Sequence, residues 1–166
     1  MKKLFFAAFV CFLFFSVVSE ASAQDKLIIL VRHAEKADET SEDPELNAAG
    51  IERAARLIKT IGKFKPGAFY STNYKRTRDT VTPWAAKRNK QVQVYDAKQP
   101  KQLIEQIMKS DIKRHVVSGH SNTIPGLANL LTGKELFKNL NDAEYGTIWV
   151  IRIKDGKLKK AEILPY

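Results

Sequence analysis

The sequence predicts a three-layer α/β/α sandwich with a mostly parallel central sheet and an antiparallel edge at the C-terminal end. From residue 26 to residue 131, short aliphatic runs alternate with longer segments of helical periodicity, as in proteins whose parallel strands are joined by helices. The last part of the chain instead holds two strand-like runs around the turn pair Asp155-Gly156, which predicts an antiparallel hairpin. With 166 residues and no internal repeat, the chain is expected to form one domain.

The first elements have the clearest signals. Lys26–Arg32 is a continuous aliphatic run, which is the pattern of a strand buried on both faces. Asn47 is a suitable N-cap for a helix whose apolar positions continue to Ile61. A Pro-Gly turn then leads into a second strand over Ala68–Ser71.

The remaining elements continue this alternation. In the second helix Pro83 predicts a kink or a late start, because proline cannot donate a backbone hydrogen bond. Gly119 and Gly133 are expected to end the fourth strand and the fourth helix. His115, which follows two basic residues, is predicted to lie on the surface at the start of a strand. The expected ranges are helices over 75–88, 102–108 and 124–131, and strands over 92–95, 115–118, 147–153 and 157–164.

Residues 1–23 are predicted to be a secretory signal peptide. Two lysines precede an apolar run over 4–18, and Ala-Ser-Ala at 21–23 provides the small residues that signal peptidase accepts. The run is slightly shorter than a membrane-spanning helix requires, which disfavours the alternative of an uncleaved anchor. Cleavage after Ala23 would leave a domain over 24–166 with no cysteine and no transmembrane anchor, in the periplasm or outside the cell.

The net charge indicates an anionic substrate or partner. The chain has 28 Lys and Arg against 18 Asp and Glu, a formal charge of +10. A single cysteine excludes a disulfide scaffold, and the basic balance excludes a disordered acidic tail. Basic residues gather over 109–114 and 154–160, but aromatic residues do not interleave with them, so no nucleic-acid partner is expected. Electrostatic contact with an anionic cell envelope would use this surface excess.

Charged and imidazole side chains follow several strands of the predicted sheet, at the carboxyl ends where ligands bind in this architecture. Arg32 and His33 follow the first strand, and Arg76 follows the second. Asp96 comes near the end of the third strand, and His120 follows the fourth. Two of the three histidines of the chain are therefore expected at one edge, together with two arginines.

Arginine and neutral histidine together suit phosphoryl transfer. The planar guanidinium binds phosphate oxygens through two parallel hydrogen bonds and stays charged. Imidazole is a nucleophile only when neutral, and neighbouring cations disfavour its protonated form. Arg32 and Arg76 would bind a phosphoryl group and keep His33 neutral. His120 would donate to the charge that builds on the phosphoryl oxygens, and the helix near Asn122 would add backbone N–H groups.

Three segments resemble the histidine phosphatase superfamily, which contains cofactor-dependent phosphoglycerate mutases and acid phosphatases. They are VRHAEK at 31–36, STNYKRTR at 71–78 and VSGHSNT at 117–123, each after a predicted strand. The segment at 46–54 is similar to the Leu-Thr-x-x-Gly-x-x-Gln-Ala segment of that family, whereas Ala34 replaces the glycine of its familiar Arg-His-Gly. The resemblance is to the small single-domain branch and implies a histidine phosphatase-like domain over 24–166.

The resemblance implies a role for each matching residue. His33 would become the phosphohistidine intermediate. Arg32 and Arg76 would hold the phosphoryl oxygens, and His120 would complete the pocket. A small phosphorylated substrate and no cofactor are implied. A metal site is disfavoured, because arginines beside the histidines repel a cation and no carboxylate pair or His-x-His spacing supports one.

The proton donor for the leaving group stays open at this point. Asp96, at the end of the third strand, is the first choice, and Glu35 and Glu144 are its rivals. Lys36 and Asn122 are further candidates for substrate binding.

The leading hypothesis is an exported, metal-independent phosphatase that hydrolyses phosphomonoesters, or related phosphoryl donors, through His33. An alternative from another class is a non-catalytic module that binds phosphorylated envelope glycans or lipids in the same pocket. A phosphoglycerate mutase-type phosphotransferase is the lesser alternative, because an exported protein lacks the cytosolic pool of sugar phosphates. The chain also has little sequence between the third and fourth strands to form a lid that excludes water.

Overall fold

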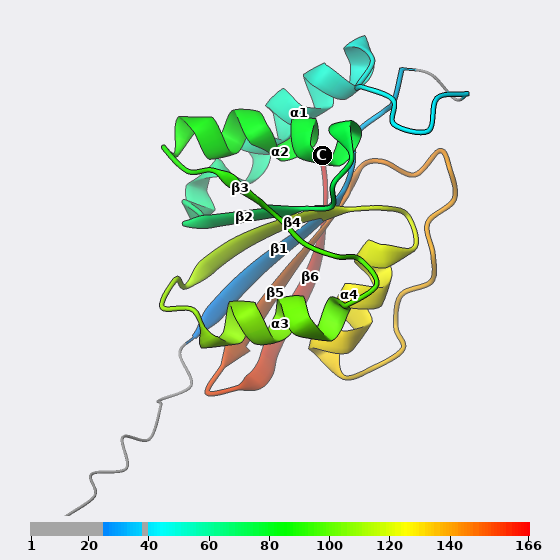
Figure 1. Cartoon of the computed structure of the whole chain (residues 1–166). Coiled ribbons are helices and arrows are strands. Elements are labelled where there is room, and N and C mark those ends of the chain that lie inside the picture. The colour runs from blue at the N-terminus through cyan, green and yellow to red at the C-terminus, as the bar shows by residue number, and fades with distance from the viewer. Residues whose placement is uncertain (1–24, 38–39) are drawn as a thin grey trace, which may run out of the picture.

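Strands and helices alternate along the chain in the computed structural model, which describes residues 25–37 and 40–166 (Figure 1). The predicted signal peptide lies outside the described residues. Within them, no helix is both long and apolar enough to cross a bilayer. The strands are β1 (Lys26–Arg32), β2 (Ala68–Ser71), β3 (Val92–Val94), β4 (Arg114–Gly119), β5 (Thr147–Lys154) and β6 (Lys157–Pro165), and the helices are α1 (Ala48–Ile61), the short 3₁₀ helix η1 (Gly62–Phe64), α2 (Lys75–Lys87), α3 (Pro100–Lys109) and α4 (Thr123–Thr132).

The six strands form one sheet in the order β3-β2-β4-β1-β5-β6. β1 pairs in parallel with β4, and β2 pairs in parallel with β3 and β4. β5 is antiparallel to β1, and β6 is antiparallel to β5. The predicted sheet, mostly parallel with an antiparallel C-terminal edge, is confirmed.

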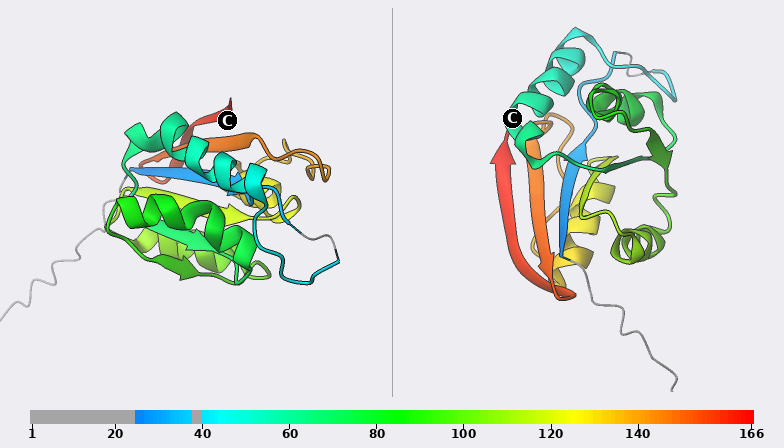
Figure 2. Two further views of the ribbon diagram at one scale, coloured as in Figure 1. Left: turned by 90° about the horizontal axis from the view of Figure 1, so that it is seen from above. Right: turned by 90° about the vertical axis from the view of Figure 1, so that its left-hand side faces the viewer.

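The helices cover both faces of the sheet, as the sandwich prediction requires (Figures 1 and 2). On one face α1 and α2 bury Leu57 and Trp84 against Ile29 of β1. On the other face α3 and α4 bury residues such as Ile107 against Ile28 of β1. All seven residues of β1 are buried, because helices cover the strand from both sides. Complete burial of each such aliphatic side chain contributes about 1.5–3 kcal/mol to folding.

The helix caps and the hairpin turn that the sequence predicts are confirmed. The Asn47 side chain accepts a hydrogen bond from Gly50 N–H at 2.9 Å and caps α1. Gly133 ends α4 with φ of 66°, the left-handed conformation that glycine adopts without strain. The turn between β5 and β6 has φ of 50° at Asp155 and 72° at Gly156, which is the twist that suits a two-residue hairpin.

The second and third helices differ from expectation. α2 runs without interruption from Lys75 to Lys87, so the late start proposed for Pro83 is wrong, and this proline lies inside the helix. α3 begins at Pro100, two residues before the expected start. Proline suits that position, because the first backbone N–H of a helix has no partner within the helix.

The prediction of a surface position for His115 is wrong. The residue is fully buried, its Nε2 donates to Ile112 O at 2.7 Å, and its ring stacks on Tyr70. Burial lowers the pKa of His115 to about 4. The physical reason is that β4 lies between β1 and β2 in the sheet, so helices cover both of its faces despite the basic residues that precede it.

Gly50 fixes how α1 packs against the turn that follows β1. A Cβ atom at this position would overlap the carbonyl oxygen of Glu35 and lie 3.0 Å from Glu35 N. The same carbonyl accepts a hydrogen bond from Asn47 N–H at 3.0 Å. The close approach is between backbone atoms, which cannot rotate away, so only glycine fits without moving the helix.

The substitution Gly50→Ala is therefore expected to destabilise the protein by about 1–3 kcal/mol through overpacking. The matched control is Gly126→Ala in α4, where a Cβ atom meets nothing within 4 Å. That control should be neutral or stabilising by up to about 1 kcal/mol, because alanine is the better helix former. Urea unfolding measures both values. Equal stability of the two variants would contradict the packing role of Gly50.

Candidate active site

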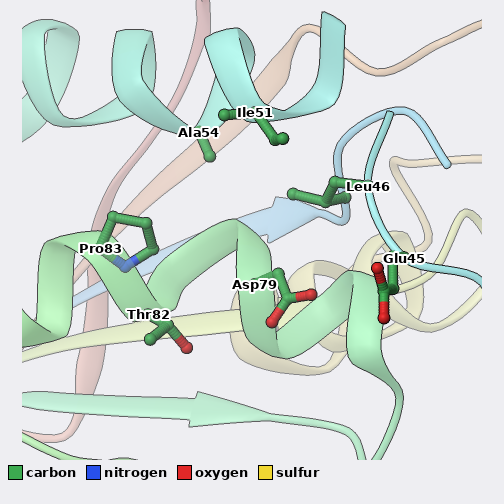
Figure 3. A pocket seen from close by; sticks show the side chains of 7 residues that line it. All are labelled: Glu45, Leu46, Ile51, Ala54, Asp79, Thr82 and Pro83. Carbon is green, nitrogen blue, oxygen red and sulfur yellow. The ribbon is translucent and has the colours of Figure 1, made fainter. Parts of the chain in front are cut away.

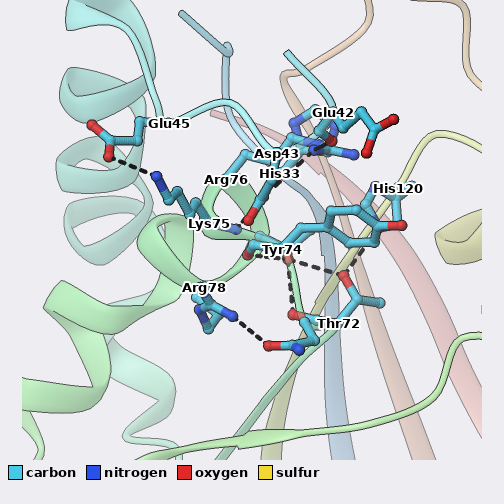
Figure 4. A network of polar contacts seen from close by, with 12 residues as sticks. His33, Glu42, Asp43, Glu45, Thr72, Tyr74, Lys75, Arg76, Arg78 and His120 are labelled. Atoms are coloured by element: carbon cyan, nitrogen blue, oxygen red, sulfur yellow. Dashed lines mark hydrogen bonds and ion pairs between the residues drawn. The ribbon is translucent and has the colours of Figure 1, made fainter.

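Two histidines meet where β1 and β4 end. His33 follows Arg32 of β1, and His120 follows Gly119 of β4. Their ring centroids are 5.5 Å apart with an interplanar angle of 68°, and Figure 4 shows them beside Arg76 at the start of α2. The structure thus brings three of the four predicted central residues together, and the fourth, Arg32, lies directly before His33.

His33 is buried and held as a neutral ring. Its backbone N–H donates to Gly119 O at 2.8 Å, which extends the pairing of β1 with β4 by one residue. Burial, followed by the charges of Arg32, His120 and Arg76, lowers the pKa of His33 to about 3, although a hydrogen bond to Ala34 O opposes the shift.

The contact with Ala34 also decides which nitrogen of His33 can react. Nδ1 lies 2.8 Å from the carbonyl oxygen of Ala34, and a carbonyl can only accept. Nδ1 of the neutral ring therefore carries the proton and donates it in this bond. The lone pair is then on Nε2, which is the nucleophilic atom.

The turn after His33 is held from both helices on its side of the sheet. Ala34 N–H donates to the Thr80 hydroxyl of α2 at 2.9 Å, and that hydroxyl donates to Arg76 O at 2.7 Å. Ala34 is fully buried, so a small side chain is needed at the position where the sequence departs from Arg-His-Gly. Together with the contact of Gly50 on Glu35, these bonds fix the ring position of His33.

His120 is fixed by two threonines. Its Nε2 lies 3.0 Å from the Thr72 hydroxyl, and its backbone N–H donates to the Thr123 hydroxyl at 2.9 Å. Burial and then the charges of Arg76 and Arg32 lower the pKa of His120 to about 4. Both rings of the site are accordingly neutral near pH 7.

Arg32 is 3% exposed and holds the loop before β5. Its Nη1 donates to the carbonyl oxygens of Asn141 at 2.7 Å, Asp142 at 3.3 Å and Glu144 at 3.0 Å. The guanidinium also lies 4.1 Å from the ring centroid of Tyr145. Its Nε is buried and makes no hydrogen bond within the described part of the chain, and its Nη2 lies 3.8 Å from a carboxylate oxygen of Asp142, so Nε and Nη2 are the atoms left to bind an anion.

Arg76 is held by a backbone carbonyl and a carboxylate of the loop between β1 and α1 (Figure 4). Its Nη1 lies 3.4 Å from Glu42 O and 3.9 Å from a carboxylate oxygen of Asp43, and its guanidinium lies over the Tyr74 ring at 4.5 Å. Asp43 also accepts a hydrogen bond from Lys75 N–H at 2.7 Å, at the start of α2. The loop therefore fixes the helix end that carries Arg76.

The three candidate proton donors are all engaged in local bonds. Asp96 accepts from Lys98 N–H at 2.8 Å and from Gln99 Nε2 at 3.3 Å. Glu144 accepts from Asn141 N–H at 2.7 Å. The carboxylate of Glu35 pairs with Arg53, whose Nη2 approaches it to 2.6 Å, and these hydrogen bonds lower the pKa of Glu35.

The two candidates for substrate binding lie near the site edge. Lys36 pairs through its backbone with Leu46, and its carbonyl accepts from Asn47 Nδ2 at 3.1 Å. Asn122 is exposed at the N-cap of α4, where its side chain makes no capping bond. The structure thus gives Lys36 a place in the turn that α1 closes, and Asn122 a place directly after His120.

Sequence reasoning missed two tyrosines that flank the histidines. Tyr145 contacts His33 edge-on at 5.9 Å, and Tyr74 contacts His120 edge-on at 5.1 Å. Each tyrosine ring also lies against the guanidinium of one site arginine, Tyr145 against Arg32 and Tyr74 against Arg76. Each ring therefore contacts one arginine and one histidine of the site. Tyr74 lies three residues after the end of β2 and could have been found by the strand-end rule. Tyr145 gives no such signal, because it reaches the site from a loop before an antiparallel strand.

A separate hollow of about 300 Å³ lies between α1 and α2 (Figure 3). None of the residues that line it is a candidate site residue. They are Glu45, Leu46, Ile51, Ala54, Asp79, Thr82 and Pro83.

Residues 25–37 and 40–166 contain no group of three or more His, Cys, Asp and Glu side chains placed to hold a metal ion.

The tautomer and charge of His33 can be observed directly. At pH 6 an ordinary histidine is largely protonated, whereas a pKa of about 3 keeps His33 neutral until the pH falls toward that value. Long-range ¹H–¹⁵N NMR should show a neutral His33 ring with its proton on Nδ1 at pH 6. The three histidines are assigned by single substitutions. An imidazolium, or a proton on Nε2, would contradict the geometry.

The comparisons with known proteins give one family match. The family model of the histidine phosphatase superfamily (branch 1) matches residues 28–105, a range that includes Arg32, His33 and Arg76. No curated protein sequence matches the chain.

Solved structures share the fold at low identity. A protein assigned as an α-ribazole-5′-P phosphatase of Escherichia coli is 13% identical, with a TM-score of 0.68 over 85% of this chain and 96% of that chain. The mycobacterial glucosyl-3-phosphoglycerate phosphatase is 12% identical, with a TM-score of 0.67 over 85% and 96%. A protein assigned as the phosphohistidine phosphatase SixA of Agrobacterium tumefaciens is 18% identical, with a TM-score of 0.63 over 85% and 99%.

The match to the family model covers the Arg-His segment and the helix start that carries Arg76, and the solved structures share the whole sandwich. Over residues 28–105 the chain therefore matches the histidine phosphatase superfamily (branch 1), and over 85% of its length it shares the fold of the Escherichia coli protein.

Proposed function

We propose that this phosphatase-type hydrolase cleaves phosphomonoesters through a phosphohistidine intermediate on His33. The observation that carries the proposal is a buried histidine with a free Nε2 lone pair, held neutral between Arg32 and Arg76 and facing His120. A neutral nucleophile surrounded by cationic and donor groups suits attack on an anionic phosphoryl group.

The reaction has two displacements at phosphorus. Nε2 of His33 attacks, an N–P bond forms, and the P–O bond to the alcohol breaks as the alcohol oxygen takes a proton from an acid. Water then attacks phosphohistidine and gives a proton back to the same acid, the N–P bond breaks, and inorganic phosphate leaves. The guanidinium groups of Arg32 and Arg76 balance the charge on the phosphoryl oxygens during both steps, and His120 donates to them.

Asp96 is the proposed proton donor. It lines a hollow of about 390 Å³ together with Thr72 and Tyr74, which both contact His120. Glu35 suits the role less, because its pairing with Arg53 favours the ionised carboxylate.

Export is part of the proposal. The basic start, the apolar run over 4–18 and the Ala-Ser-Ala sequence support cleavage after Ala23 and a place in the periplasm or outside the cell. A mature protein whose N-terminal sequence does not begin at Gln24 would contradict this processing site.

Turnover of p-nitrophenyl phosphate tests the central role of His33. We expect His33→Ala to lose at least roughly 10³-fold in rate, because the nucleophile is gone, and Arg76→Ala to lose roughly 10²-fold. His115→Gln is the control, since His115 is buried in the sheet away from the site edge and glutamine can keep its bond to Ile112. Activity should survive EDTA. Full activity in His33→Ala would remove this residue from the mechanism.

The role of Asp96 is tested by comparing leaving groups. p-Nitrophenolate leaves without a proton, whereas an alkyl alcohol needs one. Asp96→Asn should therefore lose roughly 10²-fold or more in rate with an alkyl phosphate and little with p-nitrophenyl phosphate. Glu144→Gln is the matched control, with no selective loss. The reverse pattern would assign the donor role to Glu144, and no selective loss in either variant would exclude Asp96.

A further inference from the structure

One end of the molecule is strongly basic. Helices α1, α2 and α3 run opposite to the parallel strands, so the loops that follow them lie at the edge where the parallel strands begin, and the β5–β6 turn lies at the same end (Figure 1). The loops over 62–67, 88–91, 110–113 and 154–157 carry seven Lys and Arg against two Asp. We call these four loops the basic edge. Its cations are Lys63, Lys65, Arg88, Lys90, Lys113, Lys154 and Lys157.

A hollow of about 260 Å³ opens in the middle of the basic edge, between the starts of β1 and β4 and the end of β5. Most of its lining is cationic, with Asp25 as the single carboxylate. The residues that line it are Asp25, Lys26, Leu27, Lys113, Arg114, Arg152, Ile153, Lys154 and Lys159.

Some of the cations at the hollow and the basic edge bind groups of the protein itself, and others face water. Lys26 is buried and donates to the carbonyls of Ser110 and Ile112, and Arg152 lies 3.8 Å from Glu162. In contrast, Lys113, Lys154 and Lys157 of the basic edge and Lys159 in the lining of the hollow are exposed and form no ion pair within residues 25–37 and 40–166. These four lysines, here called the lysine set, are available to an external anion.

The opposite edge has no such excess of positive charge. The described loops over 33–37, 40–47, 95–99 and 133–146 carry eight Asp and Glu against four Lys, and Arg32 with Lys75, Arg76 and Arg78 at the start of α2 brings the cations at this edge to eight. The excess of positive charge therefore lies at one end of the strands, and the molecule has an electrostatic polarity. On an anionic surface it would orient with the basic edge inward and the histidine edge outward.

The chain itself indicates which anionic surface lies near. Asp25, the first residue that the structure describes, lines the hollow of the basic edge, and the apolar run over 4–18 precedes it in the sequence. A segment with this pattern directs its chain to a bilayer, so the occupant that we argue for at the basic edge is an anionic lipid surface. Leu158 is 38% exposed between Lys157 and Lys159 and adds an apolar side chain at this edge.

A nucleic acid fits this edge less well. The only aromatic residue in the four loops is Phe64, and it is covered by cations of the protein itself, with Arg152 over its ring at 5.6 Å and Lys63 at 5.5 Å. No ring is therefore presented for base stacking.

We propose that the basic edge docks on a bilayer surface rich in anionic phospholipids and holds the histidine edge toward the aqueous phase. Juxtamembrane lysines each add to such attraction, and the attraction acts within about one Debye length of the surface. The inference does not depend on the proposed phosphatase reaction.

Binding to vesicles tests the proposal with the chain that starts at Gln24. Its two core clusters are built entirely from residues 27 onward, so this chain keeps the complete core of the described domain. It should sediment with vesicles that contain phosphatidylglycerol and not with vesicles of phosphatidylcholine alone. Raising the salt from 0.1 M to 1 M shortens the Debye length from about 10 Å to about 3 Å and should release the protein.

A matched pair of variants locates the surface. Changing the lysine set to glutamine should weaken vesicle binding at least about tenfold. The control changes Lys98, Lys101, Lys134 and Lys138 to glutamine, which removes the same charge from exposed positions at or near the histidine edge. It should bind vesicles like the unchanged protein. Thermal unfolding and p-nitrophenyl phosphate turnover confirm that the lysine-set variant is folded.

Three results would overturn the proposal. Equal loss in the two variants would mean that only net charge matters, and equal binding to both kinds of vesicle would exclude the anionic headgroup. Binding of an oligonucleotide without binding of phosphatidylglycerol vesicles would assign the edge to a nucleic acid.

Discussion

The parallel pairing of β1 with β4 is the constraint on which the candidate site depends. In its register Arg32 lies opposite Gly119, and the next residues, His33 and His120, leave the sheet at the same level. Side chains alternate between the faces of a strand, so a slip of one residue would turn one histidine away from the other. Both strands lie in the middle of the sheet with helices on both faces, and the burial of their aliphatic side chains maintains this register.

The same burial decides the chemistry of the histidines. Loss of water disfavours imidazolium, and two nearby arginines act in the same direction, so both rings are neutral. The cost is the burial of Arg32, whose charge is stabilised by three carbonyls of the loop before β5. That loop also places Tyr145 against His33, which makes it part of the site rather than a connection.

The charge of the chain divides into parts with different physical roles. Arg32 and Arg76 act on the buried site, while the loops around them are acidic and fix the helix end that carries Arg76. The surface excess of lysine lies mainly at the other end of the strands, far along the sheet from the histidines. The net charge of +10 does not show that the charges are separated in this way. The fold, and not the composition, places successive loops at opposite edges of the sheet.

The sequence by itself determined the order of the elements, the parallel sheet with its antiparallel edge, and the pairing of His33 with His120, because hydrophobic periodicity, caps and the strand-end rule are local signals. Packing against distant segments decided the rest. His115 is buried because β4 became a central strand, and Tyr145 reaches His33 because Arg32 binds its loop. The tautomer of His33 depends on how the Ala34 carbonyl is turned. Such features depend on contacts between segments far apart in the chain, and the spacing of residues in the sequence does not predict those contacts.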